Sequence, residues 1–123
     1  RLGCAATNSN ITLQGWQDNG TNLQSGTSWD RPIGGDGMEC FIDWSNSDYM
    51  YGTYQYGEIQ RSDNGGSFFN GIKNNISEEG EWITPWLQDP VNPQTIYAGY
   101  KNVWKSTNRG DNWTKYRVLI LLA

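Results

Sequence analysis

The 123-residue chain is expected to adopt an all-β fold, and three observations support this. Trp, Tyr, Thr and Ile, which favour strands, are well represented, whereas the helix formers Lys, Glu, Ala and Leu are scarce. Gly, Asn and Ser, which favour tight turns, are abundant. In addition, one nine-residue stretch occurs twice, at 61–69 and 105–113, which indicates a repeated supersecondary unit.

The two copies of this stretch fit one template: a basic residue, Ser, any residue, Asn, any residue, Gly, two further residues and an aromatic residue. The match continues upstream, because the turn that begins at Asp43 recurs 46 positions later at Asp89. Ser62 and Ser106 are only 44 positions apart, so the second copy is two residues shorter in the hairpin before the serine. The repeated unit therefore keeps its register except at one hairpin.

The N-terminal part, 1–33, is expected to form only a partial unit. Asn10–Leu13 is typical of a short strand, and Asn19-Gly20 is a strong β-hairpin signal. The segment from Leu23 to Trp29 is expected to complete this part of the chain.

A unit of four strands is predicted over 34–78, after the glycine-rich turn at 34–37. Its strands are expected at Met38–Asp43, Tyr49–Tyr54, Glu58–Arg61 and Phe68–Ile72. The polar stretch Asn74–Gly80 is expected to link this unit to the next.

A second four-stranded unit is predicted over 79–123, with strands at Trp82–Leu87, Thr95–Tyr100, Val103–Ser106 and Trp113–Val118. Pro85 in the first of these strands suggests an edge, a bulge or the strand's start, because proline cannot donate to the ladder. Four-stranded antiparallel units that repeat every 40 to 50 residues are typical of β-propeller blades. The chain is thus predicted to be a propeller segment of about two and a half to three blades.

The repeated turn closely resembles the Asp box, or bacterial neuraminidase repeat, Ser/Thr-x-Asp-x-Gly-x-x-Trp, with Asn in place of Asp in both copies. The segments 17–21, 34–37 and 89–93 also resemble those of secreted bacterial propellers of the sortilin-type or glycosyl-hydrolase-like kind. The resemblance covers nearly the whole chain and carries over to eight residues: Ser62, Asn64, Gly66, Phe69, Ser106, Asn108, Gly110 and Trp113.

The resemblance implies a structural role for the box, on the hairpin that joins the third and fourth strands, away from the usual ligand face. The Ser and Asn side chains are expected to bond the turn backbone, and the Gly to allow positive φ. Phe69 and Trp113 are expected to pack between blades. A calcium role for the box is not expected, because Asn removes the charge of Asp.

Composition excludes several functional classes. The chain has no His, which rules out Ser-His-Asp and Cys-His catalysis and most His-ligated metal sites. Its net charge of −4 and lack of a basic run argue against nucleic-acid binding. There is no apolar stretch long enough to span a membrane, and neither a metal nor a cofactor is expected. Cys4 and Cys40 are either a disulfide of a secreted protein or two separate buried thiols.

Two acidic residues next to glycines or turns are weak candidates for catalysis. Asp18 and Asp36 could act as acid and base on a glycosidic bond, as Asp pairs do in propeller glycosidases of the xyloglucanase type, which this chain resembles. The alternative is that both organise turns. Neither can be matched to a catalytic position of those enzymes.

Several aromatic residues are candidates for sugar stacking, because an aromatic face offers apolar area with a polar NH or OH beside it. Tyr54 and Tyr56 alternate, so they are expected to share one strand face. The alternative is that these residues fill the core between blades. The candidates are Trp16, Tyr54, Tyr56 and Tyr100, with Trp44, Trp82 and Trp86 as further aromatic residues.

The chain is not expected to be a sialidase, because binding the carboxylate of sialic acid needs a cluster of arginines. Arg61 and Arg109 belong to the box hairpins, which are expected on the far side of the blade. The adhesion tripeptide Arg109-Gly110-Asp111 is read as a coincidence, since the box already explains its glycine.

A ring needs four to eight blades, so this chain alone cannot close one. A homo-oligomer, or the remainder of a longer propeller, is expected to complete the ring, and the apolar end Val118–Leu122 is expected to cover or extend a neighbour's edge. The sequence thus favours a secreted, extracellular or periplasmic glycan-binding or glycoside-hydrolase-like module. The alternatives are a non-catalytic, sortilin-like protein-interaction propeller and a structural piece of a larger secreted protein.

Overall fold

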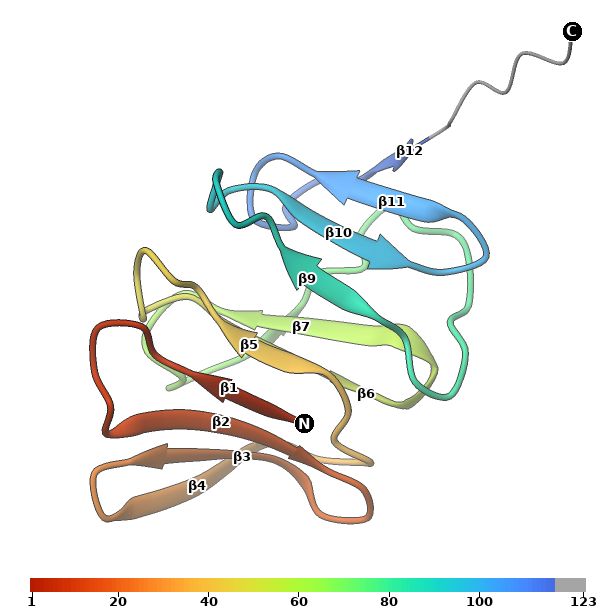
Figure 1. Ribbon diagram of the computed structural model, residues 1–123. Coiled ribbons are helices and arrows are strands. Elements are labelled where there is room, and N and C mark those ends of the chain that lie inside the picture. The colour runs from red at the N-terminus through yellow and green to blue at the C-terminus, as the bar shows by residue number, and fades with distance from the viewer. Residues whose placement is uncertain (117–123) are drawn as a thin grey trace, which may run out of the picture.

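The computed structural model describes residues 1–116 and contains three four-stranded antiparallel sheets, each built from consecutive strands (Figure 1). Blade 1 consists of β1 (Leu2–Cys4), β2 (Ile11–Trp16), β3 (Gly20–Ser25) and β4 (Ser28–Ile33). Blade 2 consists of β5 (Cys40–Ile42), β6 (Met50–Tyr54), β7 (Glu58–Ser62) and β8 (Asn70–Gly71). Blade 3 consists of β9 (Trp86–Gln88), β10 (Ile96–Gly99), β11 (Val103–Ser106) and β12 (Thr114–Tyr116).

The predicted all-β class of four-stranded antiparallel units is confirmed, with two differences in extent. The N-terminal unit has all four strands rather than part of a blade, because Leu2–Cys4 pairs with Thr12–Gln14 and adds an inner strand. The strand expected at Trp82–Leu87 begins only at Trp86. Before it, the chain turns at Thr84, whose hydroxyl donates to the carbonyl of Glu81.

The last strand of blade 2 is shorter than the sequence suggests, because β8 contains only Asn70 and Gly71. The described part of β12 is Thr114–Tyr116. The expected continuation of the last strand to Val118 and the apolar segment Val118–Leu122 lie outside the described residues. Within residues 1–116, no helix is long and apolar enough to cross a membrane.

Each blade has two faces, named here by the neighbour along the chain. The N-side face points toward the preceding blade and the C-side face toward the following one. The C-side face of blade 1 meets the N-side face of blade 2 in one core, which includes Leu13, Leu23, Ile33, Ile42, Met50 and Phe69. The C-side face of blade 2 meets the N-side face of blade 3 in a second core, which includes Tyr51, Ile59, Ile72, Trp86, Ile96, Trp104 and Trp113.

The two ends of the strands form two different edges of the stack (Figure 1). The inner-hairpin edge carries the β2–β3, β6–β7 and β10–β11 hairpins and the connectors 34–39 and 72–85. The Asp-box edge, on the opposite side, carries the turns between the first two strands of each blade and the two box turns. Every candidate residue belongs to one of these edges or to a blade face.

Candidate functional site

The two box turns have the same hydrogen-bond geometry. The Ser62 hydroxyl accepts from the backbone N–H of Gly66 at 2.9 Å and of Asn64 at 3.3 Å, and it donates to Asn64 Oδ1 at 2.8 Å. Asn64 Oδ1 also accepts from the N–H of Phe68 at 3.1 Å. The corresponding bonds of Ser106 and Asn108 are 2.8–3.3 Å long. One serine and one neutral amide therefore satisfy the turn without any ion.

The glycine and the aromatic residue of each box contact the preceding blade. Gly66 and Gly110 have φ of 89° and 91°, and a Cβ on either would lie within 2.4–2.6 Å of a side chain of that blade. Phe69 lies in the core between blades 1 and 2. Trp113 lies in the core between blades 2 and 3, where its indole N–H donates to the carbonyl of Ile72 at 2.7 Å.

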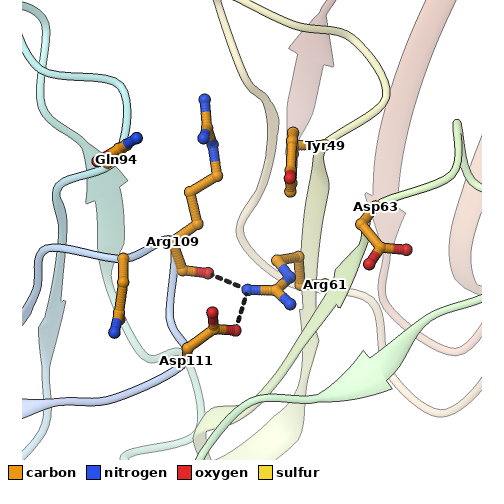
Figure 2. A pocket seen from close by; sticks show the side chains of 7 residues that line it. Tyr49, Arg61, Asp63, Gln94, Arg109 and Asp111 are labelled. Carbon is orange, nitrogen blue, oxygen red and sulfur yellow. Dashed lines mark hydrogen bonds and ion pairs between the residues drawn. The ribbon is translucent and has the colours of Figure 1, made fainter.

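A hollow of about 340 Å³ lies at the Asp-box edge between blades 2 and 3 (Figure 2). Arg61 Nη1 donates to the carbonyl of Arg109 at 2.7 Å and to Asp111 Oδ1 at 2.8 Å. Arg109 reaches back to blade 2, where its Nε lies 3.0 Å from Asp43 Oδ2 and its guanidinium 4.3 Å from the ring centre of Tyr49. Both guanidinium groups thus connect blades, and carboxylates of the same chain neutralise them.

Asp43 is fully buried and remains ionised because of its hydrogen bonds. Burial acts to raise the pKa of this carboxyl, but hydrogen bonds from the side chain and backbone of Ser45, from Gln88 and from Arg109 outweigh burial and lower it. Both charged residues of Arg109-Gly110-Asp111 are therefore engaged within the chain, which agrees with reading that tripeptide as a coincidence.

The two candidate carboxylates lie together on the inner-hairpin edge. The backbone N–H of Asp18, a residue with φ of 66°, donates to Asp36 Oδ1 at 2.6 Å. The N–H of Asp36 in turn donates to Gln55 Oε1 at 3.0 Å. This chain of bonds joins the β2–β3 hairpin, the 34–39 connector and the β6–β7 hairpin. Asp36 therefore holds three loops in place, while the side chain of Asp18 is exposed to solvent.

Tyr54 and Tyr56 do not share a face, so that prediction is wrong. The strand ends at Tyr54, and the chain enters a tight 3₁₀ turn at Gln55–Gly57 in which Tyr56 has φ of 64°. Tyr54 is half-buried against the core between blades 1 and 2. The ring of Tyr56 instead meets Trp82 on the other side, with ring centres 5.4 Å apart and planes at 82°.

The Tyr56–Trp82 pair is an open aromatic corner on the inner-hairpin edge. Tyr56 is 46% and Trp82 39% exposed. Two backbone bonds hold the pair, because the N–H of Tyr56 donates to the carbonyl of Trp82 at 3.4 Å and the N–H of Gly80 to the carbonyl of Tyr56 at 3.1 Å. Gln55, next to Tyr56, links this corner to Asp36.

The remaining two aromatic candidates do not join this corner. Tyr100 is half-buried, its hydroxyl donates to the carbonyl of Gly57, and Lys73 Nζ lies 5.5 Å from its ring centre. Burial raises the pKa of this phenol well above its usual value. Trp16 points to the N-side face of blade 1, where its ring centre lies 6.4 Å from that of Trp29.

Three residues of these sites escaped the sequence analysis. Gln55 is an ordinary polar residue in a hairpin, and Trp29 lies 13 positions from its partner, so no local pattern marks either. Glu78 lies in the stretch expected to be a polar linker, yet it accepts from Asn102 and from the indole N–H of Trp104, and Lys115 lies 3.6 Å away. Burial acts to raise the pKa of Glu78, but these partners lower it to about 2.

Neither cysteine forms a disulfide. Cys4 is exposed and Cys40 is buried, and both are free thiols. Burial raises the pKa of the Cys40 thiol to about 11, which suits a small core residue rather than a nucleophile. Among residues 1–116, no group of three or more Cys, Asp or Glu side chains is placed to hold a metal ion.

Comparison with known proteins supports the fold. No family model and no curated protein matches the sequence. Three solved structures match about 93–94% of this chain: an ancestral GH74 enzyme (TM-score 0.71, 16% identity), the GH74 enzyme of Niastella koreensis (0.66, 20%) and the GH74 xyloglucanase of Xanthomonas campestris (0.63, 16%). The chain covers only 17–22% of their lengths. At these identities the likeness shows the fold: the three sheets correspond to blades of a GH74 β-propeller.

Proposed function

We propose that this chain is part of a secreted, glycoside-hydrolase-like β-propeller and binds glycan at its inner-hairpin edge. The observation that carries this proposal is the open Tyr56–Trp82 corner, which presents two ring faces nearly at right angles. A sugar ring stacks its C–H groups on one such face while its hydroxyls reach polar groups beside it. The side chains of Asp18 and Asp36, on loops that are joined to this corner through Gln55, are the proposed polar groups.

The geometry favours binding over hydrolysis at this edge. A general acid must be free to reach the glycosidic oxygen. One oxygen of Asp36 is instead bonded to the N–H of Asp18 at 2.6 Å, which gives Asp36 a role in holding loops. The second candidate function is a non-catalytic, sortilin-like propeller that uses this edge to bind a protein or peptide in place of a glycan.

Glycan-array binding of the wild type and of two variants tests the proposal. Tyr56→Ala and Trp82→Ala should each weaken binding about tenfold, the effect of losing roughly 1.4 kcal/mol of stacking. Phe68→Ala, which removes a 63% exposed ring on the Asp-box edge, is the matched control and should bind normally. Equal binding by all four proteins would contradict the proposal. For hydrolysis, unchanged turnover by Asp18→Asn and Asp36→Asn would remove both residues from the mechanism.

We also propose that a further blade covers the C-side face of blade 3. This face has residue types similar to those of the C-side face of blade 2, and that face packs against blade 3. Strand pairing makes Tyr97 and Lys105 equivalent to Tyr51 and Arg61, since both pairs lie directly opposite each other on the second and third strands. Leu87 and Val103 on the same face are 55% and 46% exposed.

The further blade would come from a second copy of the chain or from the remainder of a longer propeller. Light scattering coupled to size exclusion distinguishes these sources. A discrete dimer or trimer supports the second copy. A monomer instead supports the longer propeller, in which case Tyr97→Asp should leave the monomer folded.

A further inference from the structure

The hollow of about 340 Å³ at the Asp-box edge lies between two blades that are both present in the chain (Figure 2). A further blade beside blade 1 or blade 3 would pack on a blade face and leave this edge open. The volume lies at the lower end of the range of about 300–1,000 Å³ that is usual for small-molecule sites. The lining includes side chains from both blades: Tyr49, Arg61, Asp63, Gln94, Arg109 and Asp111.

The guanidinium groups of this hollow are not required for packing one blade against the next. At the corresponding place between blades 1 and 2, the first box turn has Gly65 where the second box turn has Arg109. In the row that runs through the middle of the first strand, blade 1 has Leu23 where blade 2 has Arg61. Both interfaces are nevertheless packed, so the two guanidinium groups are a property of this hollow rather than of the repeated fold.

Both guanidinium groups are fixed in position and still have free donors. The Nε of Arg109 is bonded to buried Asp43, and its guanidinium carbon lies 4.3 Å from the ring centre of Tyr49. Arg61 uses Nη1 for its two bonds to blade 3. Among residues 1–116, no acceptor is bonded to Nη1 or Nη2 of Arg109 or to Nη2 of Arg61. A ligand therefore meets side chains that have already lost rotamer freedom, which lowers the entropic cost of binding.

The rim of the hollow supplies acceptors. Asp63 is exposed, and within the described chain its carboxylate has no ion-pair or hydrogen-bond partner. Asp111 is bonded to Arg61 through Oδ1, which leaves Oδ2 available. The exposed side-chain amide of Gln94 both donates and accepts. Three carboxylates, counting that of buried Asp43, accompany two guanidinium groups, so the hollow offers little net attraction to an anion.

We propose that this hollow binds a neutral sugar through adjacent hydroxyl groups. Hydroxyls both donate and accept, so they match a lining in which guanidinium donors stand next to carboxylate and amide acceptors. Two adjacent hydroxyls of a sugar ring can bridge the two nitrogens of a guanidinium or the two oxygens of a carboxylate, as in other bidentate contacts. Since Arg109 lies over the ring of Tyr49, recognition here depends on hydrogen bonds and not on stacking. The site is at the edge opposite the Tyr56–Trp82 corner, so it is independent of the proposed function.

Heteronuclear NMR of the nitrogen-labelled full chain tests the proposal. The probes are methyl α-mannoside, methyl β-galactoside and methyl β-glucoside, with glucuronate and glucosamine as charged probes. At least one neutral glycoside should shift the signals of the Arg61 Nε–H and of the Gln94 side-chain amide. Asp63→Ala should raise the dissociation constant about tenfold, and Gln94→Ala about threefold, because hydrogen bonds to a charged group are the stronger ones.

Two further variants serve as controls. Thr107→Ala should bind as the wild type, since Thr107 has in the second box turn the position of Asp63 in the first and does not line the hollow. Tyr56→Ala reports on the inner-hairpin edge: unchanged shifts at the hollow support a separate site, and their loss contradicts one. The proposal is overturned if no neutral glycoside shifts the hollow signals, if both Asp63→Ala and Gln94→Ala bind as the wild type, or if either charged probe binds more tightly than the neutral glycosides. Near-UV circular dichroism confirms that each variant is folded.

Discussion

The two blade interfaces have the same topology but are held together by different chemistry. Between blades 1 and 2 the core is mostly aliphatic, and the backbones approach closely at Gly3 and Gly15, where a Cβ would lie 2.8 Å from Phe41 Cα and 2.0 Å from the carbonyl of Met38. Between blades 2 and 3 the core is aromatic, with Tyr51 and Trp86 in contact. The indole N–H groups of Trp86 and Trp113 donate to the carbonyls of Glu39 and Ile72. Two arginines, one from each blade, pair with a carboxylate of the other blade.

The two interfaces are two different ways of packing one blade against the next. Contacts between aliphatic side chains have no preferred direction. The stability of the first interface therefore depends on complementary shape and on the glycines, which have no side chain to keep the backbones apart. Indole and guanidinium groups must be hydrogen-bonded when buried. The stability of the second interface therefore depends on hydrogen bonds, which require donor and acceptor to be correctly oriented. The first should therefore be sensitive to added volume, and the second to lost polar partners.

The largest expected effect is the loss of the second box aromatic. Trp113→Ala should lower the free energy of unfolding by about 4 kcal/mol, because it opens a cavity and leaves the carbonyl of Ile72 without its donor. Phe69→Ala, at the same box position in the aliphatic interface, should cost about 1 kcal/mol less, since its ring makes no hydrogen bond. Urea melts measure both. Equal losses of unfolding free energy in the two variants would argue against a special role for hydrogen bonds in the second interface. Phe68→Ala is the control and should hardly change the unfolding free energy.

Asp43 is the next test of the second interface. Asp43→Ala should cost about 3 kcal/mol at pH 7, because it leaves the guanidinium of Arg109 without its buried carboxylate. The pKa of Asp43 is lowered in the folded state, so its contribution is full above the ordinary carboxyl range and is lost as the pH falls through the folded pKa.

Asp43→Asn should therefore show a shallower fall in stability than the wild type between about pH 5 and pH 2. Thermal melts across this range measure the difference. Asp63→Ala, which removes an exposed carboxylate beside the same hollow, is the control and should keep the wild-type pH profile. Parallel curves of melting temperature against pH for Asp43→Asn and the wild type would show that protonation of Asp43 does not cause the loss of stability at acidic pH.

The aliphatic interface should respond most to added volume. Gly15→Ala should destabilise the protein by about 2 kcal/mol, since the new methyl group meets the carbonyl of Met38, and backbone cannot move aside as a side chain can. Gly34→Ala is the matched control, because nothing lies within 4 Å of its Cβ position. Chemical denaturation of both variants gives the comparison. A neutral Gly15→Ala would mean that the blades separate easily.

The smallest expected effect concerns the carboxylate that ties the 72–85 connector to blade 3. Glu78→Gln should leave the fold intact and lose part of the acid dependence between about pH 4.3 and pH 2, because the folded pKa is about 2. Glu79→Gln, which alters the neighbouring side chain, is the control. The two variants should differ in melting temperature at pH 5 and converge near pH 2. Identical profiles would exclude a role for Glu78.

The fold could be predicted because its signals are local and repeated. The turn template, the hairpin dipeptides and the four-strand period are each read within a few residues, and the structure contains three four-stranded sheets. Strand ends were predicted less well. β9 begins four residues later than expected, because Trp82–Pro85 belongs to a connector whose path depends on blade 2.

The candidate site was predicted only in part, because its members come from different loops. The sequence singled out Asp18, Asp36 and Tyr56 but not the bonds among their loops, which run through Gln55. It placed Tyr54 and Tyr56 on one face, whereas a left-handed residue in the turn sends them to opposite sides. Alternation along a strand ceases to hold once the strand ends.

By itself, the sequence determined the all-β class, the repeated turns and the position of those turns between the third and fourth strands, since turn chemistry and periodicity act over a few residues. Only the tertiary structure decided which of the described faces meet. Met50 and Thr12 occupy equivalent strand positions, yet one is buried by a neighbouring blade and the other borders an exposed tryptophan pair. That difference arises from contacts between segments far apart in the chain, which no local pattern records.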